Sequence, residues 1–160
     1  MDQITLERIR KMHPKLRESL LSEYQEINSM LPKGVRLRFA YTYRTPQEQH
    51  AIFLQRPRVT KADSWQSIHN YGLAFDIVLL YDKDNNETFE TASWEVNKYW
   101  KQVATYFKSK GWEWGGDWKN FKDYPHFQKS YGCTWQELKH LIDNGNIISD
   151  GFIKYPKLTL

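Results

Sequence analysis

Apolar residues recur along the chain at helix and strand spacings, with no internal repeat. They return every three or four positions between residues 14 and 31 and again between 94 and 110, which predicts two amphipathic helices. Residues 35–40 largely alternate between apolar and charged, as in a half-buried strand. Residues 73–81 form a nearly continuous apolar run, which indicates a buried strand.

Two capping boxes mark the starts of further helices. Thr45-Pro-Gln-Glu48 and Thr134-Trp-Gln-Glu137 each place a threonine three residues before a glutamate, so that side chain and backbone can cap each other. We therefore expect helices over residues 46–55 and 135–143.

The order of these elements predicts the fold class. Helices and strands are mixed without regular βαβ alternation, so we expect an α+β fold with a small, mostly antiparallel sheet and helices packed on it. Residues 56–68 and 111–118 are expected to be irregular, 126–129 to form a short strand, and the aperiodic tail 147–160 to pack along the surface. A chain of 160 residues suits one domain, 1–160.

Composition and charge exclude several classes of protein. An aromatic content of 16% excludes a disordered chain, and the single Cys133 excludes an internal disulfide framework or a Cys-rich zinc module. The net charge of +4 is scattered, so it favours only weak attraction to anionic polymers. No apolar run approaches the roughly 20 residues of a membrane span, so we expect no membrane insertion.

Asp76 is the first candidate for chemistry, because it interrupts the most apolar segment of the chain. A buried carboxylate needs a metal, a cation or several N–H donors, and accepting backbone hydrogen bonds is the simpler alternative to a ligand role. His69 precedes it by seven residues, in a loop that could return to the strand. This pair alone is a weak signal, because a lone loop histidine is commonly a solvated surface residue.

His126 extends this pair, since Pro125 restricts the backbone just before it. Two histidines and one carboxylate form a sufficient protein set for a catalytic zinc with one open position. Three acidic residues, Glu113, Asp117 and Asp123, could then serve as general base, and residue type alone does not separate them. His13, His50 and His140 lie in expected helical regions without metal partners at useful spacing.

Three blocks of the sequence, the second of them in two parts, resemble a known peptidase family. Ser67-Ile-His69-Asn-Tyr-Gly72-Leu-Ala74-Phe-Asp76 resembles the S-x-H-x-x-G-x-A-x-D signature of zinc D-alanyl-D-alanine carboxypeptidases and L-alanyl-D-glutamate endopeptidases, which share the hedgehog-type fold. Residues 111–118 and 121–128 resemble the endopeptidase branch of phage endolysins and autolysins. Residues 43–49 are similar to a third, weaker block. The resemblance covers about residues 35–130, which leaves a helix before it and a helix plus tail after it as extensions.

This resemblance implies an activity and a set of site residues. It implies that His69, Asp76 and His126 bind Zn²⁺ and that Asp123 is the general base. It also implies that Arg44 faces the substrate or the developing oxyanion, and that Ser67 belongs to the framework or contacts substrate. The expected function is a zinc metallopeptidase that cuts the stem peptide of bacterial peptidoglycan between L-Ala and D-Glu, with D-alanyl-D-alanine carboxypeptidase as the alternative.

The same residues argue against other classes of function and bear on the site of action. One alternative is a non-catalytic zinc-binding module on this fold. The presence of both a full ligand set and a candidate general base argues against it. A nucleic-acid binder is disfavoured because no RNP-like motif, Arg-rich recognition helix or basic stripe is visible. We expect a monomer. Residues 1–20 do not read as a secretory signal, which suits a phage lysin released from the cytoplasm or a chain that has lost its export signal.

Overall fold

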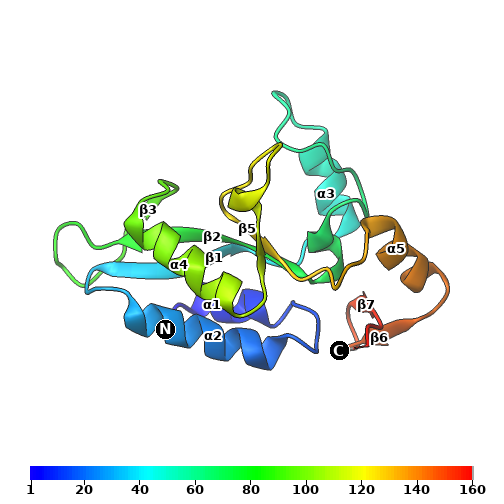
Figure 1. The fold of residues 1–160 in the computed structure, drawn as a ribbon, viewed down its shortest axis with the longest axis horizontal. Helices are drawn as coiled ribbons and strands as arrows, with labels where there is room; N and C mark the ends of the chain where they lie inside the picture. Colours follow the sequence, from blue (N-terminus) through cyan, green and yellow to red (C-terminus); the bar gives the residue numbers. More distant parts are fainter. Residues whose placement is uncertain (160) are drawn as a thin grey trace.

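The computed structural model describes residues 1–159 and places helices on a five-stranded antiparallel sheet, beside a separate two-stranded hairpin (Figure 1). The helices are α1 (Gln3–Ile9), α2 (Arg17–Met30), α3 (Pro46–Phe53), α4 (Lys98–Ser109) and α5 (Trp135–Asp143), with short 3₁₀ helices η1 (Ile68–Tyr71) and η2 (Gly115–Asp117). The strands are β1 (Val35–Tyr41), β2 (Ala74–Tyr81), β3 (Thr91–Ser93), β4 (Glu113–Trp114), β5 (His126–Gln128), β6 (Ile147–Ser149) and β7 (Lys154–Pro156). The predicted α+β class is confirmed.

The strand β2 is the central strand of the sheet. It pairs with β1 along one edge, and along the other edge it pairs first with β5 and then with β3. The order β1-β2-β5-β4 is antiparallel throughout. Because β5 is short, only the first residues of β2 have a partner there, and this is where Asp76 lies opposite His126.

Alternation along the strands separates two faces of the sheet. Phe75, Ile77 and Leu79 of β2 point into the main core, together with apolar side chains of α2 and α4. Val78 and Leu80 belong to a second, smaller cluster on the opposite face. Asp76 shares their parity, so it lies on the face away from the main core.

The helix boundaries follow local chemistry. Thr45 and Thr134 form complete capping boxes at the starts of α3 and α5, as predicted. The helix predicted from residue 94 begins only at Lys98, because the Asn97 side chain accepts hydrogen bonds from the N–H groups of residues 99 and 100 and so caps it there. The first predicted helix ends at Met30, one residue before the extended residue that precedes Pro32.

Three parts of the chain differ from the sequence-based expectation. The helix α1 and the strand β3 were not predicted, because each is too short to show a period. The tail is more regular than expected: β6 and β7 pair as a hairpin, and Tyr155 is fully buried. Its aperiodic sequence concealed this structure, since each strand has only three residues.

The hairpin β6–β7 is joined to the N-terminal part of the chain through His13 and Tyr155. His13 lies between α1 and α2 with no exposed surface, and its Nε2 is 2.7 Å from the carbonyl oxygen of Pro156. The Tyr155 hydroxyl donates to the Lys11 carbonyl. Gly72 packs directly against this contact. A Cβ atom at this position would lie 2.7 Å from both the backbone nitrogen of His13 and the ring of Tyr155. The sequence placed His13 in an expected helical region, but the structure shows it as a core residue between two helices.

Among residues 1–159, no helix combines the length and the apolar character that crossing a bilayer would require.

Candidate active site

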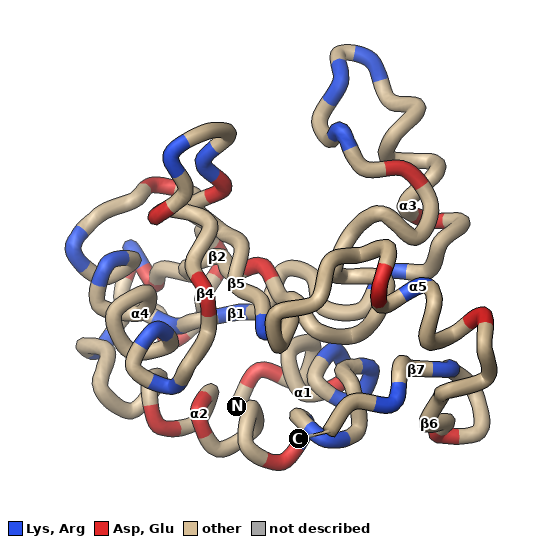
Figure 2. Tube along the Cα trace, turned by 45° about the vertical axis from the view of Figure 1, so that its right-hand side comes forward, with Lys and Arg blue, Asp and Glu red and all other residues tan. Residues whose placement is uncertain are grey.

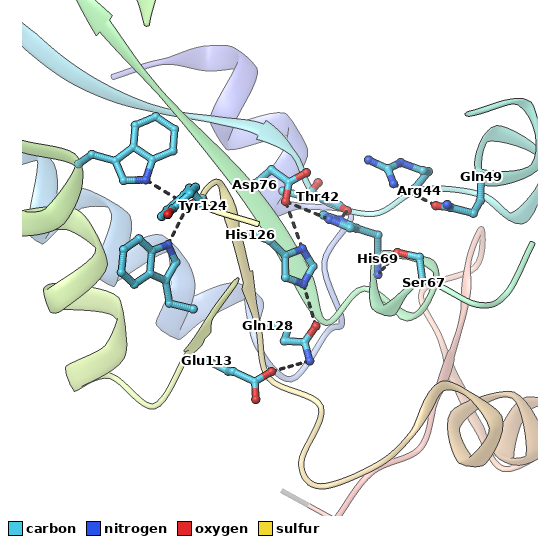
Figure 3. A network of polar contacts seen from close by, with 12 residues as sticks. Thr42, Arg44, Gln49, Ser67, His69, Asp76, Glu113, Tyr124, His126 and Gln128 are labelled. Carbon is cyan, nitrogen blue, oxygen red and sulfur yellow. Dashed lines mark hydrogen bonds and ion pairs between the residues drawn. The ribbon is translucent and has the colours of Figure 1, made fainter. Parts of the chain in front are cut away.

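The candidate site is built around Asp76, near the start of β2 on the face away from the main core. Residue 126 lies directly opposite it on β5, so both side chains point to the same face. Asp76 Oδ1 is 3.2 Å from His69 Nε2 and 3.3 Å from His126 Nδ1 (Figure 3). The structure thus brings together the three residues that the sequence offered as a ligand set.

His69 is held in place by the 3₁₀ helix η1. The Ser67 hydroxyl oxygen accepts a hydrogen bond from the His69 N–H and caps this helix. His69 Nδ1 lies 2.7 Å from the carbonyl oxygen of Thr42, which can only accept. Nδ1 therefore carries the proton, and the Nε2 lone pair faces Asp76.

His126 is fixed by a chain of hydrogen bonds that ends at a carboxylate. Gln128 lies two residues later, on the same face of β5, and its amide nitrogen donates to Glu113 Oε2 at 2.8 Å. That orientation turns Gln128 Oε1 toward His126 Nε2, at 2.7 Å. Nε2 must then donate, which leaves the Nδ1 lone pair facing Asp76 (Figure 3).

The resulting arrangement needs a positive charge. With both histidines neutral, two nitrogen lone pairs and a carboxylate oxygen face one another without a proton between them. His69 and His126 are only 3% and 6% exposed, so water can do little to relieve this. Burial by itself would raise the pKa of Asp76, but the two imidazoles prevail and lower it far below its usual range. Burial would likewise lower the pKa of His126, yet Asp76 raises it.

A zinc ion fits this set by ligand type and by spacing. His69, Asp76 and His126 each offer one ligand atom, and these atoms all lie within 4.8 Å of one another. Ligands about 2.0–2.1 Å from a tetrahedral ion are separated by about 3.3 Å, close to the two contacts that Asp76 makes. Within the part of the chain that the structure describes, no second group of three or more such residues is found.

Asp123 lies in the turn that precedes His126, and the glycine- and tryptophan-rich segment after β4 positions that turn. The Asp123 N–H donates to the Gly115 carbonyl at 3.0 Å, an approach so close that a Cβ atom on Gly115 would lie 2.3 Å from the Asp123 carbonyl oxygen. The indole N–H groups of Trp100 and Trp114 both donate to the Tyr124 carbonyl. The Trp-Gly-Gly block is thus a support for the turn.

Asp123 and the His–Asp–His cluster line the same cleft. Burial against the walls of the cleft raises the pKa of Asp123, and the negative charge of Asp76 adds to this, while His126, His69 and Arg44 oppose it. A raised pKa makes this carboxylate a better proton acceptor than an ordinary aspartate.

The two other acidic candidates do not line this cleft. Glu113 stands behind His126, with its carboxylate bound to Gln128. Asp117 forms a surface ion pair with Lys108 at 2.6 Å. Of the three acids that the sequence left open, only Asp123 has access to the same space as the cluster.

Comparisons with known proteins agree with this geometry. A family model described as D-alanyl-D-alanine carboxypeptidase matches residues 60–129. The chain is 36% identical over 105 residues to the peptidoglycan L-alanyl-D-glutamate endopeptidase CwlK of Bacillus subtilis, a match that covers 60% of this chain and 62% of that protein. The chain is similar to D-alanyl-D-alanine carboxypeptidases and L-alanyl-D-glutamate endopeptidases. The matched range includes the three residues of the His–Asp–His cluster and the candidate base Asp123.

Two further relatives extend the comparison. The L-alanyl-D-glutamate peptidase of Listeria phage A118 is 34% identical over 98 residues, which cover 61% of this chain and 32% of the phage protein. The chain therefore matches less than two thirds of the length of either curated relative. The crystal structure of the L-Ala D-Glu endopeptidase ChiX of Serratia marcescens shares the fold, with a TM-score of 0.60, 24% identity, and coverage of 82% of this chain and 90% of that one.

Arg44 and Ser67, which the family resemblance also brought forward, line the cleft as well. Arg44 donates from Nη1 to the Gln49 side chain at 3.0 Å, and its backbone N–H donates to the His69 carbonyl. The Ser67 hydroxyl oxygen is engaged as the cap of η1. Arg44 thus has further guanidinium donors to offer to a ligand, while the visible role of Ser67 is to hold His69.

Several residues of the site were not identified from the sequence. Thr42 acts through its backbone carbonyl, which leaves no trace in a sequence. Gln128 could have been found from its spacing of two from His126 on a strand. Trp118 also lines the cleft, with its ring centroid 5.4 Å from that of His126. Trp112, in contrast, is part of the core.

Proposed function

We propose that this chain is a zinc-dependent peptidase that hydrolyses the bond between L-Ala and D-Glu in the stem peptide of bacterial peptidoglycan. The convergence of His69, Asp76 and His126 beside Asp123 in one cleft carries the proposal. The two relatives described as L-alanyl-D-glutamate peptidases support the choice of bond.

His69, Asp76 and His126 would hold the zinc ion through Nε2, Oδ1 and Nδ1. When bound there, zinc supplies Lewis acidity at the substrate carbonyl and lowers the pKa of water to about 7. The ligand orientation comes from the chain itself, because Thr42 and Gln128 already direct the two lone pairs inward.

Asp123 performs the proton transfers in this proposal. Its carboxylate removes a proton from the attacking water, and it returns a proton to the amine that leaves with D-Glu. Its raised pKa suits both steps, since a strongly acidic carboxyl would be a poor proton acceptor.

Arg44 stabilises the charge that develops on the carbonyl oxygen. Its remaining guanidinium donors can bind this oxyanion, while Gln49 keeps the side chain beside the cleft. Ser67 supports the reaction by holding His69, and its hydroxyl proton is free to contact substrate.

A second candidate is D-alanyl-D-alanine carboxypeptidase activity, which the description of the matching family model favours. Both reactions use the same groups and differ only in the bond presented to them. In either case the substrate places the site of action at the bacterial cell wall, and we expect the protein to act as a monomer.

Digestion of purified peptidoglycan by the zinc-loaded protein tests the proposal. Mass spectrometry of the products should show stem peptides that begin with D-Glu and muramyl groups that retain L-Ala. Release of terminal D-Ala alone would support the carboxypeptidase instead. Unchanged muropeptides, with about one zinc bound per chain, would point to a non-catalytic binding module.

A further inference from the structure

A second cleft continues from the active site between two loops. Its walls are the loop after α3, at residues 58–62, and the segment before β5, at residues 118–123. The two clefts share Trp118 and Asp123, so a ligand can extend from the His–Asp–His cluster into the second cleft without leaving the protein surface. Figure 2 shows that the loop after α3 stands out from the body of the molecule and carries several Lys and Arg positions.

The charges along this second cleft are unbalanced. Arg58 and Lys61 on one wall and Lys122 on the other face a single carboxylate, that of Asp123, at the catalytic end. Within residues 1–159, none of these three cations forms an ion pair with an acidic side chain at 4.0 Å or less. We call this cleft the cationic groove.

Aromatic rings and a carbonyl hold these cations at the groove. Lys61 Nζ lies 3.2 Å from the centroid of the Phe121 ring, and Arg58 lies over the ring of Phe53. Lys122 Nζ donates to the Gly116 carbonyl at 3.0 Å. Each cation is therefore positioned without being neutralised.

Phe121 is itself an unusual residue. Its side chain is 75% exposed, and its backbone is left-handed with φ of 54°. A bulky residue in this conformation is strained, and such strain is commonly found at binding sites. An exposed ring beside Lys61 offers an apolar surface together with a positive charge.

The chemistry of the proposed substrate has the complementary charge on one side of the scissile bond only. Glutamate has two carboxyl groups, and only one is needed to extend the peptide, so a D-Glu that is not amidated leaves with a free carboxylate. L-Ala, on the other side of the bond, contributes no charged side chain. We propose, resting on the proposed function, that the cationic groove binds the carboxylates of the leaving-group half of the stem peptide.

Neutralising two cations tests this proposal. The double variant R58Q/K61Q removes two charges from the groove, and K33Q/K83Q is the matched control, because both its lysines are exposed at the opposite end of the β1–β2 pair from Asp76. Each is assayed on a synthetic stem peptide with free carboxylates and on the same peptide with its carboxylates converted to primary amides.

We expect R58Q/K61Q to raise KM for the free-carboxylate peptide by about 2–30-fold, as the loss of two exposed charge pairs implies, with kcat little changed. KM for the amidated peptide should not respond to the substitutions, and K33Q/K83Q should match the wild type on both peptides. Equal changes of KM on both peptides would overturn the proposal, because the loops would then act by shape. A loss of affinity for whole walls without any change on peptides would also overturn it, and would assign the cations to another anionic wall polymer.

Binding measurements keep the result separate from the proposed activity. Calorimetric titration of the free and amidated peptides into the zinc-loaded wild type and R58Q/K61Q requires no turnover. If the wild type cuts neither peptide, the proposed function fails. The groove is then judged by binding alone: a preference for the free peptide that R58Q/K61Q loses supports it, and no preference overturns it.

Discussion

Three buried histidines lie in two regions of this molecule that use the imidazole ring in different ways. His13, at the contact between the N-terminal segment and the hairpin β6–β7, has both nitrogens engaged: Nδ1 accepts from the Lys15 N–H, and Nε2 donates to the Pro156 carbonyl. His69 and His126 each engage one nitrogen with a protein acceptor and direct the other toward Asp76.

The difference shows that burial does not distinguish a structural histidine from a candidate metal ligand. All three histidine residues are 6% exposed or less. What differs is the lone pair: backbone N–H satisfies it in His13, whereas in the cluster two lone pairs meet a carboxylate oxygen. The first arrangement is complete as a neutral ring, and the second requires a cation.

The sharpest test of this comparison is to remove one histidine from each region. His69→Ala and His126→Ala should each lose zinc and lose activity with it, because two ligands remain where three are needed. His13→Ala should bind about one zinc per chain, like the wild type. Metal analysis after dialysis measures this, and full zinc occupancy in both ligand variants would contradict the assignment.

The next largest effect should come from the proposed base. Asp123→Asn keeps the volume and removes the basicity, so turnover should fall by about 10²–10⁴-fold while zinc stays bound. Asp117→Asn is the matched control, since its carboxylate pairs with Lys108 on the surface. Lysis of purified walls, run beside metal analysis of the same samples, checks this. Loss of zinc in Asp123→Asn would make this residue a ligand instead of a base.

A smaller loss of zinc affinity is expected from Gln128, which orients the proposed ligand His126. Gln128→Ala removes the acceptor of the His126 Nε2–H, so zinc affinity should fall by about 10–100-fold. Gln136→Ala, at an exposed position of α5, is the control. Competition with a chelator measures the affinity, and ¹⁵N NMR of the metal-free protein should show that His126 no longer favours the Nε2–H tautomer. An unchanged tautomer would refute the role of Gln128.

Replacing His13 should have the smallest effect on the site, because this residue contributes to the stability of the fold and does not face the cluster. His13→Ala leaves the Pro156 carbonyl without its donor, at a cost of about 1–3 kcal/mol in the free energy of unfolding at pH 7. Zinc affinity should not change.

The pH dependence of that cost has a definite sign. Burial lowers the pKa of His13 below its usual 6.5. The unfolded chain then binds more protons below about pH 6.5, so the stability that neutral His13 provides is lost as the pH falls. The difference in unfolding free energy between wild type and His13→Ala should therefore shrink from pH 7 to pH 5 in denaturant titrations. A constant difference would show that the ring is not held neutral.

Elements governed by neighbouring residues could be predicted from the sequence. The capping boxes of α3 and α5 involve residues only three apart, and the apolar run of β2 records burial on both faces. The candidate ligands also came from local signals: an acid inside an apolar strand, and histidines in short motifs. Short elements such as α1, β3 and the hairpin β6–β7 could not be predicted, because their stability comes from distant partners.

The sequence alone determined the class of fold, the candidate ligand set and the presence of three acids near it. The residue types left Glu113, Asp117 and Asp123 open, and the family resemblance favoured Asp123. Only the tertiary structure shows that Asp123 alone of the three lines the cleft with the cluster, because their positions depend on how β4 and β5 pair and on the contact between residues 115 and 123. That pairing is held by core side chains such as Phe75 and Phe127, which stack with ring centroids 5.3 Å apart. Such contacts join residues far apart in the chain, so their consequences for lone pairs, tautomers and the cationic groove appear only once the core has formed.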